Sequence, residues 1–140
     1  MRLVLDTNTA LSGLLGDVTP GRLIQAAETG NLEIVSSVPL LTELRDVLAR
    51  DKFARRLAQR GISGTQIFTD YVALVTIVAP AHISPTIARD PADDAVLAVA
   101  VGANVDPIVS GDAHLLNLKS FQGIDIVSAA AANGRINSAD

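Results

Sequence analysis

The chain has 140 residues, of which 49% are hydrophobic and 19% charged, with a formal net charge of −4 and no cysteine. This length and hydrophobicity fit one globular domain and exclude a disordered chain, which combines low hydrophobicity with high net charge. The lack of cysteine excludes a disulfide framework, a thiolate metal site and a cysteine nucleophile. The negative charge, taken alone, argues against a nucleic-acid partner, because phosphate-binding domains are usually basic.

Short apolar runs alternate with longer stretches of helical periodicity along the chain. In order, the pattern predicts a strand at 2–5, helices at 8–15 and 20–29, a strand at 33–36, helices at 37–50, 51–60 and 65–74, a strand at 75–78, a helix at 90–103, a strand at 107–110, a helix at 112–118, a strand at 124–127 and a helix at 128–132. Thr19 is expected to cap the helix that follows it. Short apolar strands that alternate with helices predict an α/β fold with a parallel sheet covered on both faces.

The domain organisation expected from this pattern is a single domain at 1–132 followed by a polar, frayed tail at 133–140. The longest apolar run, residues 95–101, is too short to span a bilayer, which takes about 18 residues. The apolar stretch near the N-terminus ends at Asp6, which is too early for a secretory signal. We therefore expect a cytoplasmic protein with no membrane association.

Acidic residues gather where the predicted strands end and the predicted helices begin. Asp6 follows the first strand directly, and Asp112 comes shortly after the fourth. Glu43 lies in the first turns of the helix after the second strand, and Asp93 and Asp94 lie in the first turn of the helix before the fourth. Ligands of such folds bind beyond the carboxyl ends of the strands, so we expect these acids to meet at one edge of the sheet.

Carboxylates that converge repel one another unless a cation lies between them. The two histidines, His82 and His114, are too far apart in sequence to suggest a zinc site, so oxygen ligands favour Mg²⁺ or Mn²⁺. Such a site activates a water molecule for phosphodiester hydrolysis. Asn8 and Ser110 could orient the ligands by hydrogen bonds, or simply serve the turns in which they lie.

Each acid also has a structural interpretation. Asp6 and Asp112 are suited to cap the helices that follow them, and Glu43 could lie in solvent. Asp90 is a natural cap before the helix-starting proline, with Asp93 three residues further on. It is the combination of these acids in one α/β chain that favours a functional site.

Four segments of the chain together resemble the PIN-domain nucleases. The segments are LDTN at 5–8, LLTEL at 40–44, RDPADDAVL at 89–97 and VSGDAHLL at 109–116. In order and spacing they are most similar to the bacterial PIN family of toxins from toxin–antitoxin pairs, which is related to the VapC-type toxins. The resemblance covers the chain to about Ser128.

The resemblance implies a three-layer α/β/α Rossmann-like PIN fold with a parallel five-stranded sheet. It implies an endoribonuclease that depends on Mg²⁺ or Mn²⁺ and acts on RNA by metal-activated water. Such a nuclease would serve as the toxin of a type II pair with a cognate antitoxin. The apolar helical segment at 65–78 could form the interface with an antitoxin or the interface of a homodimer. By position, the catalytic acids would be Asp6, Glu43, Asp94 and Asp112. The metal ligands would be Asp6, Asp94 and Asp112, with Asp93 as a further acid, and Asn8 and Ser110 would match the small polar positions of the family.

A basic segment follows Glu43. Six of the 11 Lys and Arg residues lie between positions 45 and 60, against only two acids. They could form a solvated helix face with local ion pairs, such as Asp51 with Arg55. They could equally contact RNA phosphates. The residues expected on the RNA backbone are Arg45, Arg50, Lys52, Arg55 and Arg56.

Other functions fit the same acidic residues. The chain could be a PIN nuclease of housekeeping RNA processing, or a binding module that holds a basic peptide in its acidic cleft without turnover. A haloacid-dehalogenase-like phosphatase is disfavoured because Asn8 stands where a second aspartate is needed. A receiver domain is disfavoured because no acidic pair lies at the first strand.

Overall fold

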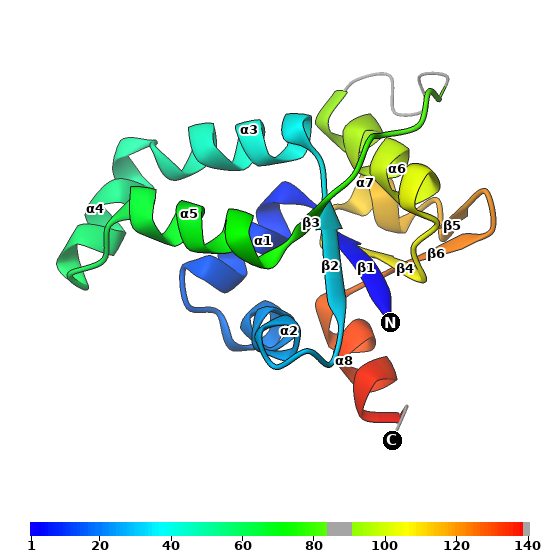
Figure 1. Cartoon of the computed structure of the whole chain (residues 1–140), viewed down its shortest axis with the longest axis horizontal. Coiled ribbons are helices and arrows are strands. Elements are labelled where there is room, and N and C mark those ends of the chain that lie inside the picture. The colour runs from blue at the N-terminus through cyan, green and yellow to red at the C-terminus, as the bar shows by residue number, and fades with distance from the viewer. Residues whose placement is uncertain (84–90, 139–140) are drawn as a thin grey trace.

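The structure, a computed structural model, describes residues 1–83 and 91–138. The strands of this part are β1 Arg2–Leu5, β2 Glu33–Ser36, β3 Thr76–Ile77, β4 Pro107–Val109, β5 Ser120–Phe121 and β6 Ile124–Val127. They form one sheet in the order β3-β2-β1-β4-β6-β5, which lies at the centre of the molecule (Figure 1). The helices are α1 Thr7–Leu14, α2 Val18–Glu28, α3 Val38–Leu48, α4 Asp51–Gln59, α5 Gly64–Leu74, α6 Pro91–Ala103, α7 Ala113–Leu116 and α8 Ala129–Ser138.

The predicted α/β class is confirmed, but the sheet has six strands instead of five. The five predicted strands pair in parallel, and the additional strand β5 pairs antiparallel with β6. Gln122 and Gly123 connect this hairpin with φ angles of 49° and 81°. Two left-handed residues in a two-residue loop match the twist of the strands that they join. No local pattern marks β5 in the sequence, because the strand is only two residues long and its turn is Gln-Gly rather than Asn-Gly.

Several helix boundaries differ from the predictions by one or two residues, and the end of α8 differs by six. Helix α2 begins after Asp17 rather than after Thr19. Helix α8 continues to Ser138, although the sequence predicts its end at residue 132 and a frayed tail after it. Tertiary contacts extend this helix, because the Asn133 amide donates a 2.8 Å hydrogen bond to the Thr19 carbonyl and Ile136 packs against the core.

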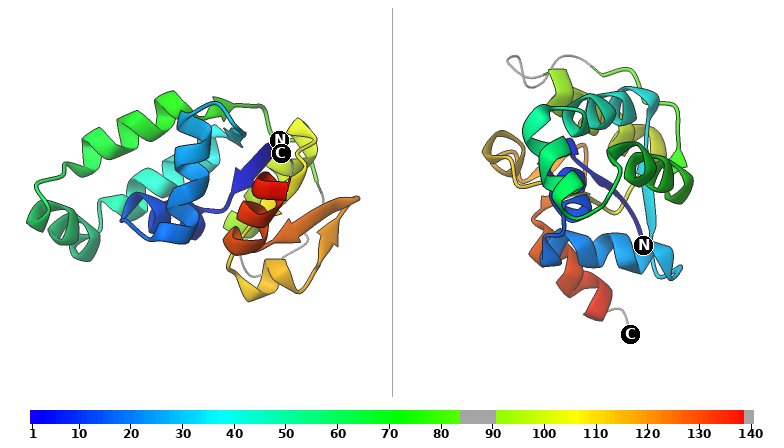
Figure 2. Two further views of the ribbon diagram at one scale, coloured as in Figure 1. Left: turned by 90° about the horizontal axis from the view of Figure 1, so that it is seen from below. Right: turned by 90° about the vertical axis from the view of Figure 1, so that its left-hand side faces the viewer.

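Alternate residues of the central strands face two separate cores. Leu3 and Leu5 lie in one core, which is covered by α1, α2, α3, α5 and α8, whereas Val4 lies in the other, which is covered mainly by α6 and α7. Figure 2 shows the helices on either side of the sheet, with α2 and α8 next to each other. The all-apolar segment of α6 is largely buried, as its composition predicts. Within residues 1–83 and 91–138, no helix is long and apolar enough to span a membrane.

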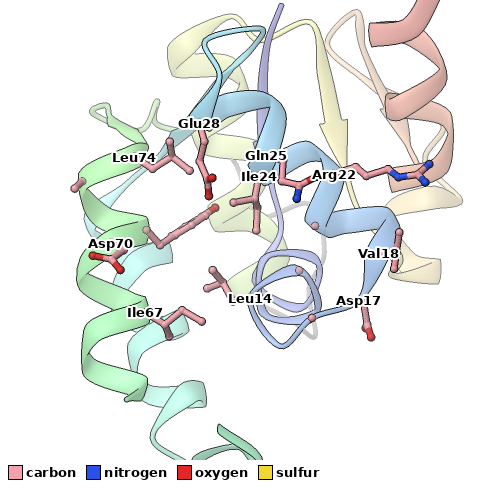
Figure 3. A pocket seen from close by; sticks show the side chains of 15 residues that line it. Leu14, Asp17, Val18, Arg22, Ile24, Gln25, Glu28, Ile67, Asp70 and Leu74 are labelled. Atoms are coloured by element: carbon pink, nitrogen blue, oxygen red, sulfur yellow. The ribbon is translucent and has the colours of Figure 1, made fainter. Parts of the chain in front are cut away.

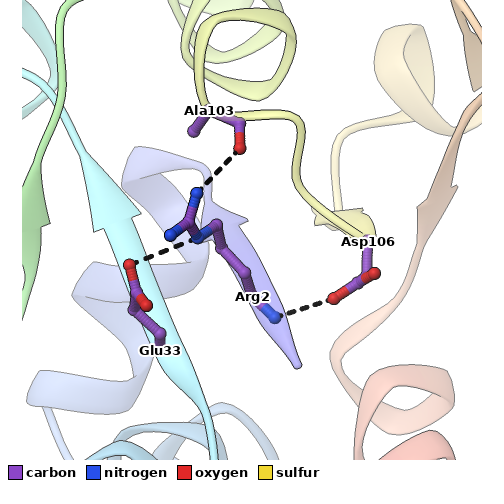
Figure 4. A network of polar contacts seen from close by, with 4 residues as sticks. All are labelled: Arg2, Glu33, Ala103 and Asp106. Atoms are coloured by element: carbon purple, nitrogen blue, oxygen red, sulfur yellow. Dashed lines mark hydrogen bonds and ion pairs between the residues drawn. The ribbon is translucent and has the colours of Figure 1, made fainter.

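Arg2 connects four elements at the amino end of the sheet (Figure 4). Its backbone N–H donates to a carboxylate oxygen of Asp106 at 2.8 Å, and its guanidinium donates to the Ala103 carbonyl at 3.0 Å. The Nε atom of Arg2 lies 3.3 Å from a carboxylate oxygen of Glu33. These contacts join β1 to β2, to the end of α6 and to the loop before β4, so this edge of the sheet serves the stability of the fold.

Candidate active site

The strand order reverses between β1 and β4, which are neighbours in the sheet. From β1 the chain moves to β2 and β3 on one side, and from β4 it moves to β6 on the other. In open α/β sheets, ligands bind beyond the carboxyl ends of the strands at such a switch point. Asp6 is the first residue after β1 and Ser110 the first after β4, so both lie at this position.

Asp6 is held from both sides. Its side chain is buried, with 4% of the residue exposed. Oδ1 accepts a 2.8 Å hydrogen bond from the Thr9 N–H, which makes Asp6 the N-cap of α1. Oδ2 accepts a hydrogen bond from the Ser110 hydroxyl. The predicted cap is therefore present, and the same carboxylate is fixed at the switch point.

Ser110 links Asp6 to Asp112. Its Oγ atom, which donates to Asp6, accepts a 2.9 Å hydrogen bond from the Asp112 N–H. Asp112 in turn accepts a 2.7 Å bond from the His114 N–H and caps α7. The Ser110 side chain is buried, so one hydroxyl sets the relative positions of two acids.

Glu43 reaches the same region from α3 and is half-buried rather than solvated. Its Oε2 atom accepts a 2.8 Å hydrogen bond from the Thr7 hydroxyl. Thr7 had no role in the sequence-based assignment. Its position between Asp6 and Asn8 in the LDTN segment was the only signal for it.

Helix α6 supplies the remaining acids. Asp93 is 5% exposed and borders the pocket that Asp6, Glu43 and Asp112 also border. Asp94 is partly exposed and does not belong to that lining. Asp93 therefore borders the same pocket as the other three acids, on the helix that also carries Asp94. Asp90, the expected cap of this helix, lies outside the described residues.

The acid pocket, as we call this hollow, is small, at about 40 Å³. Its lining consists of Asp6, Thr7, Asn8, Glu43, Asp93, Val96 and Asp112. The donors are carboxylate and neutral oxygens, with no Lys or Arg among the described residues that border it, and this donor set fits a hard divalent cation. No three acidic or histidine side chains of the described part are close enough to hold one ion together, so the arrangement is an open one.

The basic residues lie away from the acid pocket. Figure 1 shows α3 running outward from the sheet to α4, at the end of the molecule opposite α6 and α7. Arg50, Lys52, Arg55 and Arg56 are exposed there, and a guanidinium nitrogen of Arg45 on α3 lies 3.4 Å from a carboxylate oxygen of Asp46. Arg60 has a different role, because its guanidinium donates a 2.6 Å hydrogen bond to the Leu15 carbonyl at the end of α1.

A hollow of about 750 Å³ lies apart from the acid pocket. It lies between α1, α2 and α5, and Leu14, Ile24 and Ile67 point into it (Figure 3). Tyr71 also borders it, and burial, together with the negative charge of Asp6, raises the pKa of the Tyr71 hydroxyl above its ordinary value. We call this hollow the helix groove.

A comparison with protein-family profiles finds a match that covers most of the chain. The family profile described as "PIN domain" matches residues 2–114. This range runs from β1 into α7 and includes all the acids that border the acid pocket. No curated protein matches the chain. Since the profile covers well over half of the sequence, the chain belongs to the PIN domain family.

Proposed function

We propose that this protein is a metal-dependent endoribonuclease. The observation that carries the proposal is the convergence of four carboxylates, from four separate segments of the chain, on one small pocket at the switch point of the sheet. Membership of the PIN domain family supports it, because PIN domains are generally metal-dependent nucleases and would act on RNA.

A cation in the acid pocket would be held by one or two of the carboxylates of Asp6, Asp93 and Asp112 together with water molecules, with Glu43 as the fourth acid of the pocket. A bound Mg²⁺ or Mn²⁺ supplies positive charge for the phosphate oxygens and lowers the pKa of a water molecule. The protein's own contribution is positioning. Ser110 fixes Asp6 and Asp112 relative to each other, and Thr7 holds Glu43. The ligand role of Asp94, which the family resemblance implies, stays a prediction.

The substrate strand would extend from the acid pocket toward α4. Lys52, Arg55 and Arg56 follow the i, i+3, i+4 spacing that places side chains on one face of a helix. Because α4 is remote from the acids, these residues would contact phosphates several nucleotides from the cleaved bond. Asn8, which is exposed at the border of the acid pocket, is suited to contact the nucleotide beside it.

A toxin role requires an antitoxin, and the helix groove offers a surface for one. Its apolar floor is flanked by three acidic side chains and one basic side chain, which are Asp17, Glu28, Asp70 and Arg22. An apolar helix with basic flanks would match both properties. A second copy of the chain, in a homodimer, is the other occupant that we consider.

The toxin role is tested by expressing the chain in growing bacterial cells. Growth arrest that is absent with Asp6→Asn, and that co-expression of a small protein from a neighbouring gene relieves, would support a toxin. Cleavage in vitro without growth arrest would indicate housekeeping RNA processing instead.

The nuclease itself is tested with a mixed RNA substrate incubated with Mn²⁺, with Mg²⁺ or with EDTA. We expect cleavage by the wild type that EDTA stops, and none by Asp6→Asn or Asp112→Asn. Asp70→Asn is the matched control, because Asp70 is exposed on α5, where its carboxylate accepts a hydrogen bond from Gln66. Metal-dependent cleavage that persists in both site variants would refute the assignment, and RNA binding without turnover would favour a binding module.

A further inference from the structure

A second hollow adjoins the acid pocket. It has a volume of about 370 Å³ and shares Asn8 and Asp112 with the lining of the acid pocket. The first turns of α1, the start of α2, the loop after β4 and the start of α8 border this open hollow. We call it the polar pocket. A strand whose phosphate lies at the acids would therefore have its neighbouring nucleotide at this position.

The polar pocket offers hydrogen-bonding groups that the fold does not use. Thr9 is only 8% exposed, yet its hydroxyl has no hydrogen-bond partner within the described part of the chain. The side chains of Asn8 and Ser12, from the same helix, also make no hydrogen bond there. A hydroxyl that makes no hydrogen bond within the protein and borders a hollow is available to bond a ligand there.

The charge of the lining identifies the kind of ligand. Neither Lys nor Arg borders the pocket among the described residues, and Asp17 and Asp112 do. A phosphate group would be repelled, whereas a neutral group with several donors and acceptors would be accepted. The hydroxyl of Ser128 and the side-chain amide of Asn8 can each donate and accept hydrogen bonds. The volume lies within the range of small-molecule sites.

We propose that the polar pocket receives the base of the nucleotide next to the cleaved phosphodiester, and that Thr9 is a specificity-determining residue for that base. This inference rests on the proposed nuclease function. A pocket that hydrogen-bonds one base edge discriminates against bases that leave its groups unpaired. The enzyme would then cleave RNA with a preference at one position beside the cut.

The first test measures binding without cleavage. The metal-free protein is titrated with each of the four ribonucleosides and with inorganic phosphate, and amide chemical shifts are followed by NMR. We expect at least one nucleoside to shift the amides of Thr9, Ser12, Gly111 and Ala129, with no such effect of phosphate. Thr9→Val keeps the size of the side chain and should weaken this binding about 5-fold, as expected for the loss of one hydrogen bond.

Thr65→Val is the matched control, because Thr65 is exposed on α5 outside the lining of the polar pocket. Ser12→Ala provides a second variant if Thr9→Val does not fold. The inference is wrong if no nucleoside perturbs these amides, if phosphate perturbs them instead, or if a folded Thr9→Val binds as the wild type does.

The second test maps cleavage sites on a randomised RNA pool with Mn²⁺. We expect Thr9→Val to alter the relative rates at one position beside the cut. Unchanged relative rates at every position would overturn the specificity role even though the nuclease is active. If nucleosides bind and the wild type cleaves no RNA, the nuclease proposal fails while the base-binding site stands.

Discussion

Thr7 donates a 2.8 Å hydrogen bond to Glu43, although 36 residues separate them in the sequence. The bond joins the first turn of α1 to α3, and so it fixes Glu43 relative to Asp6, the cap of that same turn. A threonine beside the first acid is thus a positioning residue for the second.

We expect Thr7→Val to lower cleavage about 10-fold. The variant keeps the shape of the side chain but removes a hydrogen bond to a charged group, which contributes about 1.5–3 kcal/mol. Thr7→Ser should retain most of the activity, because the hydroxyl remains. Steady-state kinetics at saturating and limiting Mn²⁺ measure both. Equal rates for the valine and serine variants would show that the hydrogen bond has no part in the reaction.

Asp93 and Asp94 are predicted to differ in their effect. Because Asp93 borders the acid pocket and Asp94 does not, Asp93→Asn should lose at least about 100-fold in cleavage and Asp94→Asn much less. The wild type should also gain thermal stability when Mn²⁺ is added, since a ligand of the folded state stabilises it. Asp93→Asn should lose most of that gain. If Asp94→Asn loses more cleavage activity than Asp93→Asn, Asp94 is the metal ligand instead.

Salt dependence tests whether α4 binds RNA. Replacing Arg50, Lys52, Arg55 and Arg56 with Gln should reduce the slope of log K against log salt, by up to about 0.7 for each RNA phosphate that the variant no longer binds. Replacing Arg22, Lys119 and Arg135, which lie outside α4, should leave the slope almost unchanged. Fluorescence anisotropy with a labelled RNA and the Asp6→Asn protein gives the slopes. If the α4 variant has the same slope as the parent protein, α4 does not bind RNA and is an ordinary solvated helix face.

The Tyr71 hydroxyl is predicted to lose its proton at a higher pH than an ordinary tyrosine. It is the single tyrosine, and the chain has no tryptophan, so ultraviolet absorbance reports on it alone. Burial and Asp6 raise its pKa above the ordinary value, and we expect ionisation well above pH 10 in the folded protein and near pH 10 after unfolding. The free energy of unfolding should then be unaffected by Tyr71 below pH 10 and fall as pH rises beyond it, because the unfolded chain loses the proton first.

Tyr71→Phe supplies the control for that titration. Its stability should fall less steeply above pH 10 than that of the wild type. A wild-type absorbance change centred near pH 10 under native conditions would show that Tyr71 is solvated rather than buried.

Arg2→Gln should lower the stability of the fold and leave the rate of RNA cleavage unchanged. The substitution removes the bond from the guanidinium to Ala103 and the ion pair with Glu33, at the edge of the sheet opposite the acids. A loss of about 1 kcal/mol would lower the melting temperature by about 2–4 °C. Turnover at a temperature where the variant is fully folded should equal that of the wild type. A large loss of turnover there would show that the two edges of the sheet are coupled.

Much of the fold was predictable because local signals and tertiary structure agree. The short apolar runs became the parallel strands, and the rule for strand ends placed Asp6 and Asp112 at the same edge. Strand β5 was not predictable, since two residues carry no periodicity. The length of α8 was not predictable either, because its last turns depend on contacts of Asn133 and Ile136 with distant residues.

The choice between Asp93 and Asp94 shows where sequence reasoning about the site ends. Adjacent helical residues point about 100° apart, so which of them meets Asp6 depends on how α6 docks on the sheet. The local sequence pattern does not determine how α6 is rotated about its axis against the sheet. The hydrogen bond of Thr7 is similar, because it requires the position of α3 relative to α1.

The spacing of the four carboxylates along the chain has a consequence during synthesis. Asp6 and Asp112 are separated by 105 residues, so Asp112 is synthesised long after Asp6. No nascent fragment that ends before Asp112 contains the full set. A nuclease that depends on all four acids would therefore be inactive in any fragment that ends before Asp112.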